Sequence, residues 1–354
     1  MPQRWQQAPP GSHWGEFGPD DQRGRLNLVT PEKVLQGVAE VREGRTFCLS
    51  LPLDVPGGQS LNRRRIAPRR FAVIRDGQSA GQQGFCWSYD SEDPDLTDVV
   101  NDDVVLMSLQ YSTQWDSLAH MGSRFDADGD GVAEMVFYNG FRAGSDILPA
   151  RADAAAAGTF AHYPQPRADA LGIEHIAEHG VQGRAVLVDL AHHIGRRREA
   201  VGYDALMRIL EADGIQVECG DLVCIHTGFA DTLLSMNRQP DVAYLHETGS
   251  GLDGNDARLL QWIVDVRLAS LIADNPAVEL VVPSVRAHAG IRRPRLPLHE
   301  HCLFKNGIPL GELWYLTELA QWLRARKRHR FLLTAPPLRL PGAVGSPVTP
   351  VATV

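Results

Sequence analysis

Two side chains that could carry metal or acid–base chemistry, Asp116 and His120, lie four positions apart in the sequence. They follow an apolar run, residues 104–107, which we expect to form a buried strand entered from the polar residues 101–103. The end of a strand is a common place for catalytic or metal-binding residues. The structural alternative is a polar strand end whose Asp116 caps a turn, so residues elsewhere in the chain must decide.

A second group of polar residues lies far downstream, within residues 296–301 and 307–313. We expect His299 near the end of a loop or strand and Glu312 at the start of a helix that runs to residue 326. A carboxylate at a helix N-terminus is stabilised by the helix dipole, so Glu312 also has a structural explanation. His301 competes with His299 as the functional histidine of this group.

Residues 126–131 read Asp-Ala-Asp-Gly-Asp-Gly and superficially match a calcium-binding loop. The twelfth position of that pattern is Phe137 instead of a bidentate Glu, and no flanking helices are evident. A turn-rich loop is therefore the better interpretation of this segment.

The composition is that of a soluble globular protein. The chain has 354 residues, of which 44% are hydrophobic and 22% are charged. A net charge of -8 argues against nucleic acid or an anionic membrane as the main partner, and short basic clusters such as residues 63–65 are expected to be solvated faces. The five cysteines form no C-x-x-C pair, which fits a reducing compartment. With no signal-peptide pattern and no membrane-spanning apolar run, we expect a cytoplasmic protein.

The order of predicted elements indicates an α/β protein with a mixed sheet. Thr30 followed by Pro31 is typical of a helix start. In the second half of the chain, strands alternate with helices; the strands are expected at 184–190, 221–226, 268–273 and 331–334, and the helices at 171–180, 203–213 and 255–266. No repeat or linker marks a boundary, so we predict a single domain, 1–354. An N-terminal segment, 1–30, and a Gly/Arg/Gln-rich excursion, 56–92, are expected to pack on its body.

These residues carry a resemblance to a known family. The sequence resembles the cyclase or kynurenine-formamidase-like family of metal-dependent hydrolases, whose signature is H-x-G-T-H-x-D-x-P-x-H followed much later by a His and a Glu. With the signature Asp on Asp116, its last His falls on His120. Its first two His fall on Gln110 and Gln114, which is a departure from the family pattern.

The resemblance extends along nearly the whole chain. The late His and Glu of the family fall on His299 and Glu312. Other stretches that match the long branch of the family are residues 13–15, 24–27, 137–140, 274–279, 337–342 and 345–347. The resemblance implies a swivelling β/β/α fold with a mixed sheet, assembled as a homodimer or homotetramer.

The resemblance also implies a metal site, which the two glutamines alter. A glutamine oxygen is a weaker zinc ligand than an imidazole nitrogen, so we expect the first metal position of the family to be lost or weakened. Asp116, His299 and Glu312 still make a three-ligand set for one divalent ion, zinc or manganese. The sequence therefore predicts one metal ion per site instead of two.

The activity implied is hydrolysis of a small cyclic or N-acyl amide, a lactam or a lactone by metal-activated water. His120 is the expected proton carrier, because imidazole titrates near neutral pH. Asp116 is the expected catalytic ligand, and Gln110 and Gln114 are expected to bind substrate by hydrogen bonds or to support the ligands.

Three aromatic residues could form the wall of a substrate pocket: Trp14, Trp115 and Tyr138. Each could equally belong to the core. Two other functions remain open for the whole chain, because a fold does not fix a function. One is a metal-free cyclase or dehydratase of secondary metabolism, which the two glutamines favour. The other is a ligand-binding homologue without catalysis.

Overall fold

The computed structural model describes residues 3–75, 84–149, 166–281 and 293–354. Within these residues the main sheet has nine strands in the order β1-β19-β17-β11-β13-β15-β16-β6-β18. Four neighbouring strands run parallel to one another: β11 (Gln182–Asp189), β13 (Leu222–His226), β15 (Ser270–Ala273) and β16 (Leu310–Glu312). The predicted mixed α/β sheet is confirmed.

Antiparallel strands flank the parallel centre on both sides. On one side lie β17 (Arg330–Thr334), β19 (Val351–Thr353) and β1 (Thr46–Cys48). On the other side, β6 (Gln114–Asp116) pairs with β16 and with β18 (Gly345–Pro347). The two edges of the sheet are therefore formed by β1, from the N-terminal part of the chain, and β18, from its C-terminal part. Strand β6 places residues of the first half of the chain between two strands of the second half.

Alternation of side chains along the strands produces two cores, one on each face of the sheet. Along β11, Val186 and Val188 join one cluster with Leu206 of α4 (Tyr203–Asp213) and Leu259 of α7 (Ala257–Asp265). Ala185 and Leu187 join the other cluster. Helices α2 (Ile173–His179) and α9 (Thr317–Ala325) contribute apolar side chains to that second cluster.

Shorter helices complete the body: α1 (Pro31–Val38), α3 (Leu190–Ile194), α5 (Phe229–Ser235), α6 (Val242–Glu247) and α8 (Pro297–His299). Helix α1 begins as its sequence predicts, because the Thr30 hydroxyl accepts a hydrogen bond from the Lys33 backbone N–H. The N-terminal segment lies on the body, where Trp5 and Trp14 are buried. No helix in the described part of the chain has the length and apolar character needed to cross a bilayer.

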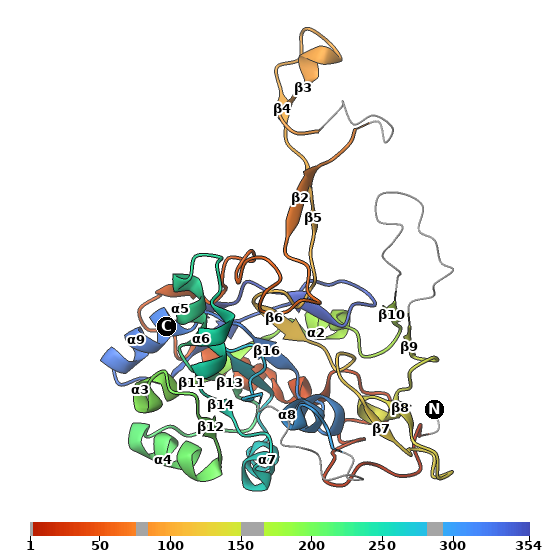
Figure 1. Cartoon of the computed structure of the whole chain (residues 1–354), viewed down its shortest axis with the longest axis vertical. Coiled ribbons are helices and arrows are strands. Elements are labelled where there is room, and N and C mark those ends of the chain that lie inside the picture. Colours follow the sequence, from red (N-terminus) through yellow and green to blue (C-terminus); the bar gives the residue numbers. More distant parts are fainter. Residues whose placement is uncertain (1–2, 76–83, 150–165, 282–292) are drawn as a thin grey trace.

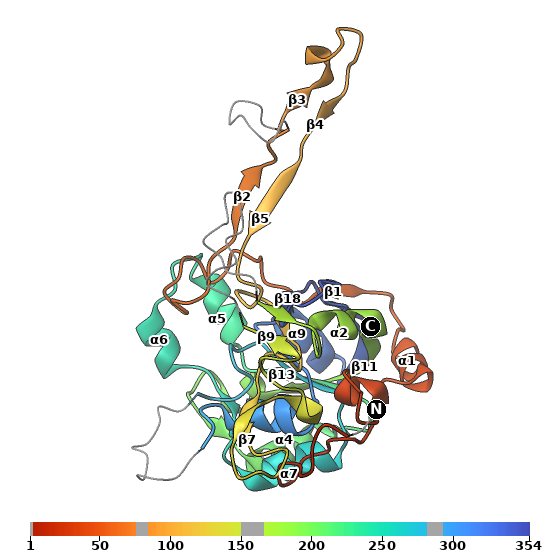
Figure 2. The ribbon, with the colours of Figure 1, turned by 90° about the vertical axis from the view of Figure 1, so that its right-hand side faces the viewer.

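One region differs from the sequence prediction. Strand β2 (Arg69–Ala72) pairs with β5 (Asp103–Leu106), and β3 (Trp87–Ser88) pairs with β4 (Val99–Val100), which makes a narrow two-stranded arm. Figures 1 and 2 show this arm extending away from the body instead of packing on it. Residues 76–83 of the predicted excursion lie outside the described residues.

The apolar run at 104–107 is therefore not a buried strand. Val104 and Val105 are 40% and 56% exposed, as is Phe71 opposite them at 46%. The run has the composition of a core strand, but within the described part of the chain no second layer covers the two-stranded ribbon. Composition alone could not show that the covering layer is missing.

Candidate functional site

Strand β6 carries the focal residues of the sequence to one face of the sheet. Gln114 and Asp116 alternate with Trp115, so their side chains lie on the face opposite to the Trp115 indole. In the antiparallel pairing with β16, Gln114 lies directly opposite Glu312, and Leu310 lies opposite Asp116. Cross-strand partners share a face, so the side chains of Asp116 and Glu312 meet on the same side. Glu312 ends a strand, and the prediction that it opens a helix is wrong.

His299 reaches this face from a short helical segment. Helix α8 starts with Pro297 at its first turn and continues into η4 (Glu300–Lys305), a π-helical turn. The prediction of a loop or strand end for His299 is therefore wrong. π-Helical turns often occur at functional sites because they change the direction in which side chains project.

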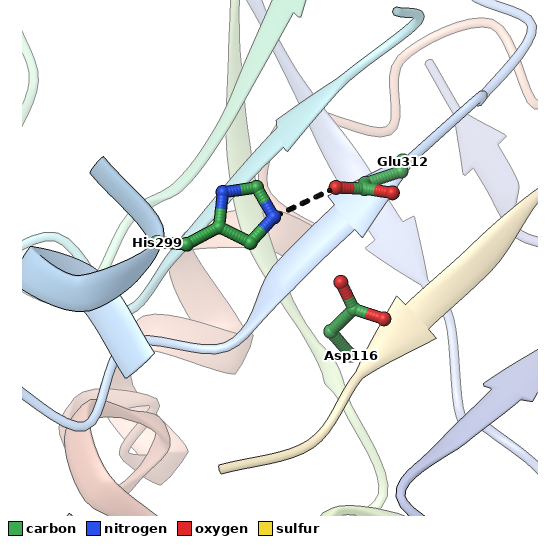
Figure 3. A group of neighbouring side chains, drawn as sticks. All are labelled: Asp116, His299 and Glu312. Carbon is green, nitrogen blue, oxygen red and sulfur yellow. Dashed lines mark hydrogen bonds and ion pairs between the residues drawn. The ribbon is translucent and has the colours of Figure 1, made fainter. Parts of the chain in front are cut away.

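A buried carboxylate fixes the orientation of the His299 ring. Nδ1 of His299 lies 2.8 Å from Oε1 of Glu279, and the backbone N–H groups of Leu298 and His299 donate to the same carboxylate at 3.2 and 3.1 Å. The opposite ring nitrogen, Nε2, lies 3.1 Å from Oε1 of Glu312 (Figure 3). Glu279 thus holds Nδ1 and directs Nε2 toward the acidic residues.

The structure brings together the three predicted metal ligands. Each of Asp116, His299 and Glu312 offers one ligand atom that lies within 4.8 Å of the ligand atoms of the other two (Figure 3). All three residues are buried. Oδ2 of Asp116 is buried and has no hydrogen-bond partner among the described residues. An orphaned carboxylate oxygen is costly unless a cation or another donor satisfies it. Two carboxylate oxygens and one imidazole nitrogen fit a divalent ion such as zinc or manganese.

The pKa values of Asp116 and His299 also indicate a site that lacks positive charge. Burial raises the pKa of Asp116 to about 6, because the charged carboxylate loses its hydration. Burial alone would lower the pKa of His299, but hydrogen bonds to Glu279 and Glu312 outweigh it and raise that pKa to about 10. Without a metal ion, the proton on His299 is the positive charge that lies between two carboxylates.

Gln114 completes the floor of the site. Its Nε2 donates to Oε2 of Glu312 at 2.8 Å and lies 3.4 Å from Oδ1 of Asp116. Its Oε1 accepts a hydrogen bond from Nη1 of Arg65 at 3.5 Å. The amide therefore links a guanidinium on one side to two carboxylates on the other, which an imidazole at this position could not do in the same way.

Gln110 lies beside the floor, half-buried. Gly345 of β18 gives it room, since a Cβ at that position would lie 2.5 Å from Nε2 of Gln110. His120 is 23% exposed, and its Nε2 lies 3.7 Å from Oδ2 of Asp116. An imidazole in this position can reach both the Asp116 carboxylate and a molecule in the cleft.

These residues open into a cleft of about 1290 Å³, which is lined by Gln110, His120, His299 and Glu312. A smaller cavity of about 530 Å³ shares lining residues with it, among them Arg64, Arg65 and Arg295. Its wall contains the apolar side chains of Phe229, Leu245, Leu280 and Leu313. The two hollows adjoin, so together they could take a substrate with one apolar and one polar part.

The three predicted wall aromatics lie elsewhere, and none lines the described walls of either hollow. Trp115 is fully buried on the opposite face, edge-on to Trp314, and its indole N–H donates to the Ala335 carbonyl at 2.8 Å. Trp14 packs against Trp5 and Phe304, and Tyr138 is fully buried. All three are core residues; for Trp115 the alternation of β6 makes a place in the cleft impossible.

Two residues of the site were missed by reasoning from the sequence. Glu279 lies within residues 274–279, a stretch that resembled the family but suggested no role. Arg65 belongs to the basic cluster 63–65, expected to be a solvated face. Both act over long sequence distances, 20 residues from Glu279 to His299 and 49 from Arg65 to Gln114, so no local pattern marks them.

The sequence model of the family described as "Putative cyclase" matches residues 49–280. The chain belongs to this cyclase family. The match includes Asp116, His120 and Glu279 and ends before His299 and Glu312. None of the curated proteins matches the chain.

Solved structures of similar fold agree with this membership. The crystal structure of a novel cyclase superposes with a TM-score of 0.70 at 29% identity, and the alignment covers 97% of each chain. Isatin hydrolase A from Labrenzia aggregata has a TM-score of 0.53 at 13% identity, over 91% of this chain and 98% of that one. Isatin hydrolase A from Ralstonia solanacearum gives 0.52 at 13% identity, over 91% and 97%. These likenesses confirm the expected cyclase-family fold.

Proposed function

We propose that this cyclase-family protein is a hydrolase that cleaves a small cyclic or N-acyl amide, a lactam or a lactone with the help of one divalent metal ion. The observation that carries the proposal is the convergence of Asp116, His299 and Glu312 below a cleft, with Oδ2 of Asp116 left without a hydrogen bond among the described residues. Proteins of similar fold carry the name isatin hydrolase, which supports hydrolytic chemistry for this fold.

In this proposal Asp116, His299 and Glu312 hold the ion, and Glu279 keeps the proton of His299 on Nδ1 so that Nε2 is free to bind. A divalent ion bound there would supply Lewis acidity toward a carbonyl oxygen and would lower the pKa of a water molecule. Gln114 restrains the Glu312 carboxylate through the 2.8 Å hydrogen bond. The site is thus held in place by neighbours on three different elements.

His120 is the proposed proton carrier. Its Nε2 lies within reach of the Asp116 carboxylate, and the ring lines the cleft. As water attacks the carbonyl carbon, Nε2 accepts its proton and then passes it to the leaving nitrogen or oxygen as the bond to carbon breaks. The partly exposed ring can contact the substrate, whereas the three metal ligands are buried.

One contact favours a second candidate, a metal-free cyclase or dehydratase. His299 Nε2 and Glu312 Oε1 are close enough to share a proton at 3.1 Å. A protonated His299 could then act as a general acid toward a substrate in the cleft, with Asp116 as the base. This candidate needs no ion, so chelation separates the two.

The test is turnover of isatin, N-formylanthranilate and a δ-lactone by protein that has been stripped of metal and then reloaded with zinc or manganese. We expect chelation to abolish turnover and the metal to restore it. Asp116→Asn should lower kcat/KM by about 10³-fold, and His120→Asn should lower kcat by about 10²- to 10⁴-fold.

Asp213→Asn is the matched control, because Asp213 pairs with His193 outside the cleft and should leave turnover unchanged. Full activity in exhaustively stripped protein would replace the metal hydrolase by the metal-free candidate. A metal-loaded protein that turns over none of the three probes would count against hydrolysis.

A further inference from the structure

The wall of the cleft carries a positive charge that the proposed hydrolysis does not use. Arg64, Arg65 and Arg295 line both adjoining hollows, and they come from two segments that are far apart in the sequence. Within the described residues none of the three forms an ion pair with a carboxylate. Some arginines elsewhere are paired, for example Arg238 with Asp54 at 3.0 Å and Arg258 with Asp204 at 2.9 Å.

Arg65 is the best placed of the three. It is half-buried, and its Nη1 donates to Oε1 of Gln114, whose Nε2 donates to Glu312. Gln114 therefore positions the guanidinium at the edge of the acidic floor. A guanidinium has five N–H donors, and among the described residues one of those of Arg65 is used, in the bond to Gln114.

The distribution of charged and apolar surface in the cleft indicates which kind of ligand would fit. The floor of the cleft is acidic, with Asp116 and Glu312, and the wall near Arg65 is basic. The apolar surface of Phe229 and Leu245 lies in the smaller hollow, beside the same arginines. A neutral substrate would offer these guanidinium groups no anionic partner, whereas a substrate with an anionic group next to an apolar body would match both features.

We propose that the substrate carries a carboxylate, which Arg65 binds together with Arg64 and Arg295 while the bond to be cleaved lies over Asp116, His299 and Glu312. This assignment rests on the proposed hydrolytic function and adds the substrate class to it. Planar guanidinium groups match a carboxylate in two-point hydrogen bonds. A doubly charged phosphate would meet stronger repulsion from the acidic floor, so a single negative charge is the better match.

The test compares two probes that differ by one charge, N-formylanthranilate and N-formylanthranilamide. The wild-type protein, loaded with zinc, should show the higher kcat/KM for the carboxylate probe, mainly through a lower KM. Arg65→Gln should lower the ratio of the two kcat/KM values by about 10- to 100-fold. Arg65→Lys should recover part of that ratio, since it keeps the charge but loses the two-point geometry.

Arg258→Gln is the matched control, since Arg258 is a surface arginine paired with Asp204, and the ratio should not change. If Arg65 served only to balance the charge of Asp116 and Glu312, Arg65→Gln would affect both probes equally. An unchanged ratio would therefore overturn the proposal, as would a wild-type preference for the amide probe.

A binding measurement separates this proposal from the proposed function. In the Asp116→Asn variant, stripped of metal, calorimetry should show that anthranilate binds at least about 10-fold more tightly than anthranilamide, and that Arg65→Gln added to this variant removes the difference. If neither formyl probe is turned over but this preference is present, hydrolysis is wrong and the carboxylate site stands. If the probes are turned over without any charge preference in kinetics or binding, the carboxylate site is wrong and hydrolysis stands.

Discussion

Asp116 and Asp221 are both fully buried carboxylates beside strands of the main sheet, and they differ in how they are paired. Asp221 accepts hydrogen bonds from Nε and Nη2 of Arg184 at 2.8 and 2.9 Å, from Nζ of Lys33 at 3.1 Å and from the Glu218 backbone N–H at 2.7 Å. Asp116 has one long hydrogen bond, 3.4 Å from Gln114, and its second oxygen has no hydrogen bond among the described residues, with only His120 Nε2 nearby at 3.7 Å.

This difference separates buried charges that stabilise the fold from buried charges that remain available to bind a cation. The cluster of Asp221, Arg184 and Lys33 satisfies both carboxylate oxygens with protein donors, so nothing further is needed there. The cluster of Asp116, His299 and Glu312 gathers carboxylates around one imidazole and leaves an acceptor free. Poorly compensated buried charges cluster at functional sites, where some stability is given up for binding or catalysis.

The largest expected effect concerns the free energy of unfolding of metal-free protein at pH 7. Asp221→Asn should lower it by about 3 kcal/mol, because Arg184 and Lys33 lose their buried partner. Asp116→Asn should instead raise it by on the order of 1 kcal/mol, because a poorly paired buried charge is removed. Urea denaturation of the two variants and the wild type measures both changes. Destabilisation of similar size in both variants would remove the distinction between the clusters.

The next effect concerns Glu279, which positions His299 without belonging to the ligand set. Glu279→Gln should weaken zinc binding by about 10- to 100-fold, since an amide holds the Nδ1 proton less strongly and makes the imidazole a poorer ligand. Competition with a chromophoric chelator measures the affinity. Glu218→Gln, a change at the Asp221 cluster, should leave zinc affinity as it is. Equal losses in both variants would indicate general loosening instead of a positioning role.

The smallest effect is a pH dependence. Burial raises the pKa of Asp116 to about 6 in the folded chain, above its ordinary value of about 4. The folded state therefore favours the protonated carboxyl. The stability that this group contributes is present below about pH 4 and is lost as the pH rises through about 6.

In metal-free protein, the unfolding free energy of the wild type minus that of Asp116→Asn should therefore fall between pH 4 and 7, by at most about 1.4 kcal/mol per pH unit. Urea titrations at each pH give the difference, in which groups common to both proteins largely cancel. A difference that rises with pH would show that the carboxylate is better paired than the structure indicates.

The fold could be predicted from the sequence where elements are long and periodic. The strand at 184–190 and the helix at 203–213 match β11 and α4 closely, because burial on one face leaves a clear pattern. The prediction failed at Glu312, which lies in a strand of three residues, too short to show a period. It also failed at residues 104–107, where a core-like composition occurs in an arm that no other described residues cover.

The candidate site could be predicted from the sequence only in part. Asp116, His299 and Glu312 came from the family resemblance, and the fold brings them together across 196 positions of sequence. Arg65 and Glu279 gave no signal, because a cation beside an amide and a carboxylate behind an imidazole are spatial relations. Trp115 was misplaced because the face of a three-residue strand is decided by its neighbours in the sheet.

The most direct test of the central claim is anomalous diffraction from crystals of the wild-type protein soaked in zinc, with Asp116→Asn crystals alongside. We predict one peak per chain that contacts Oδ2 of Asp116, Nε2 of His299 and an oxygen of Glu312, and no peak there in the variant. The acidic loop with Asp126, Asp128 and Asp130 is an internal comparison, because its oxygens also lie close together but are partly or fully exposed. A peak at that loop alone, or none between Asp116, His299 and Glu312, would contradict the proposed metal site.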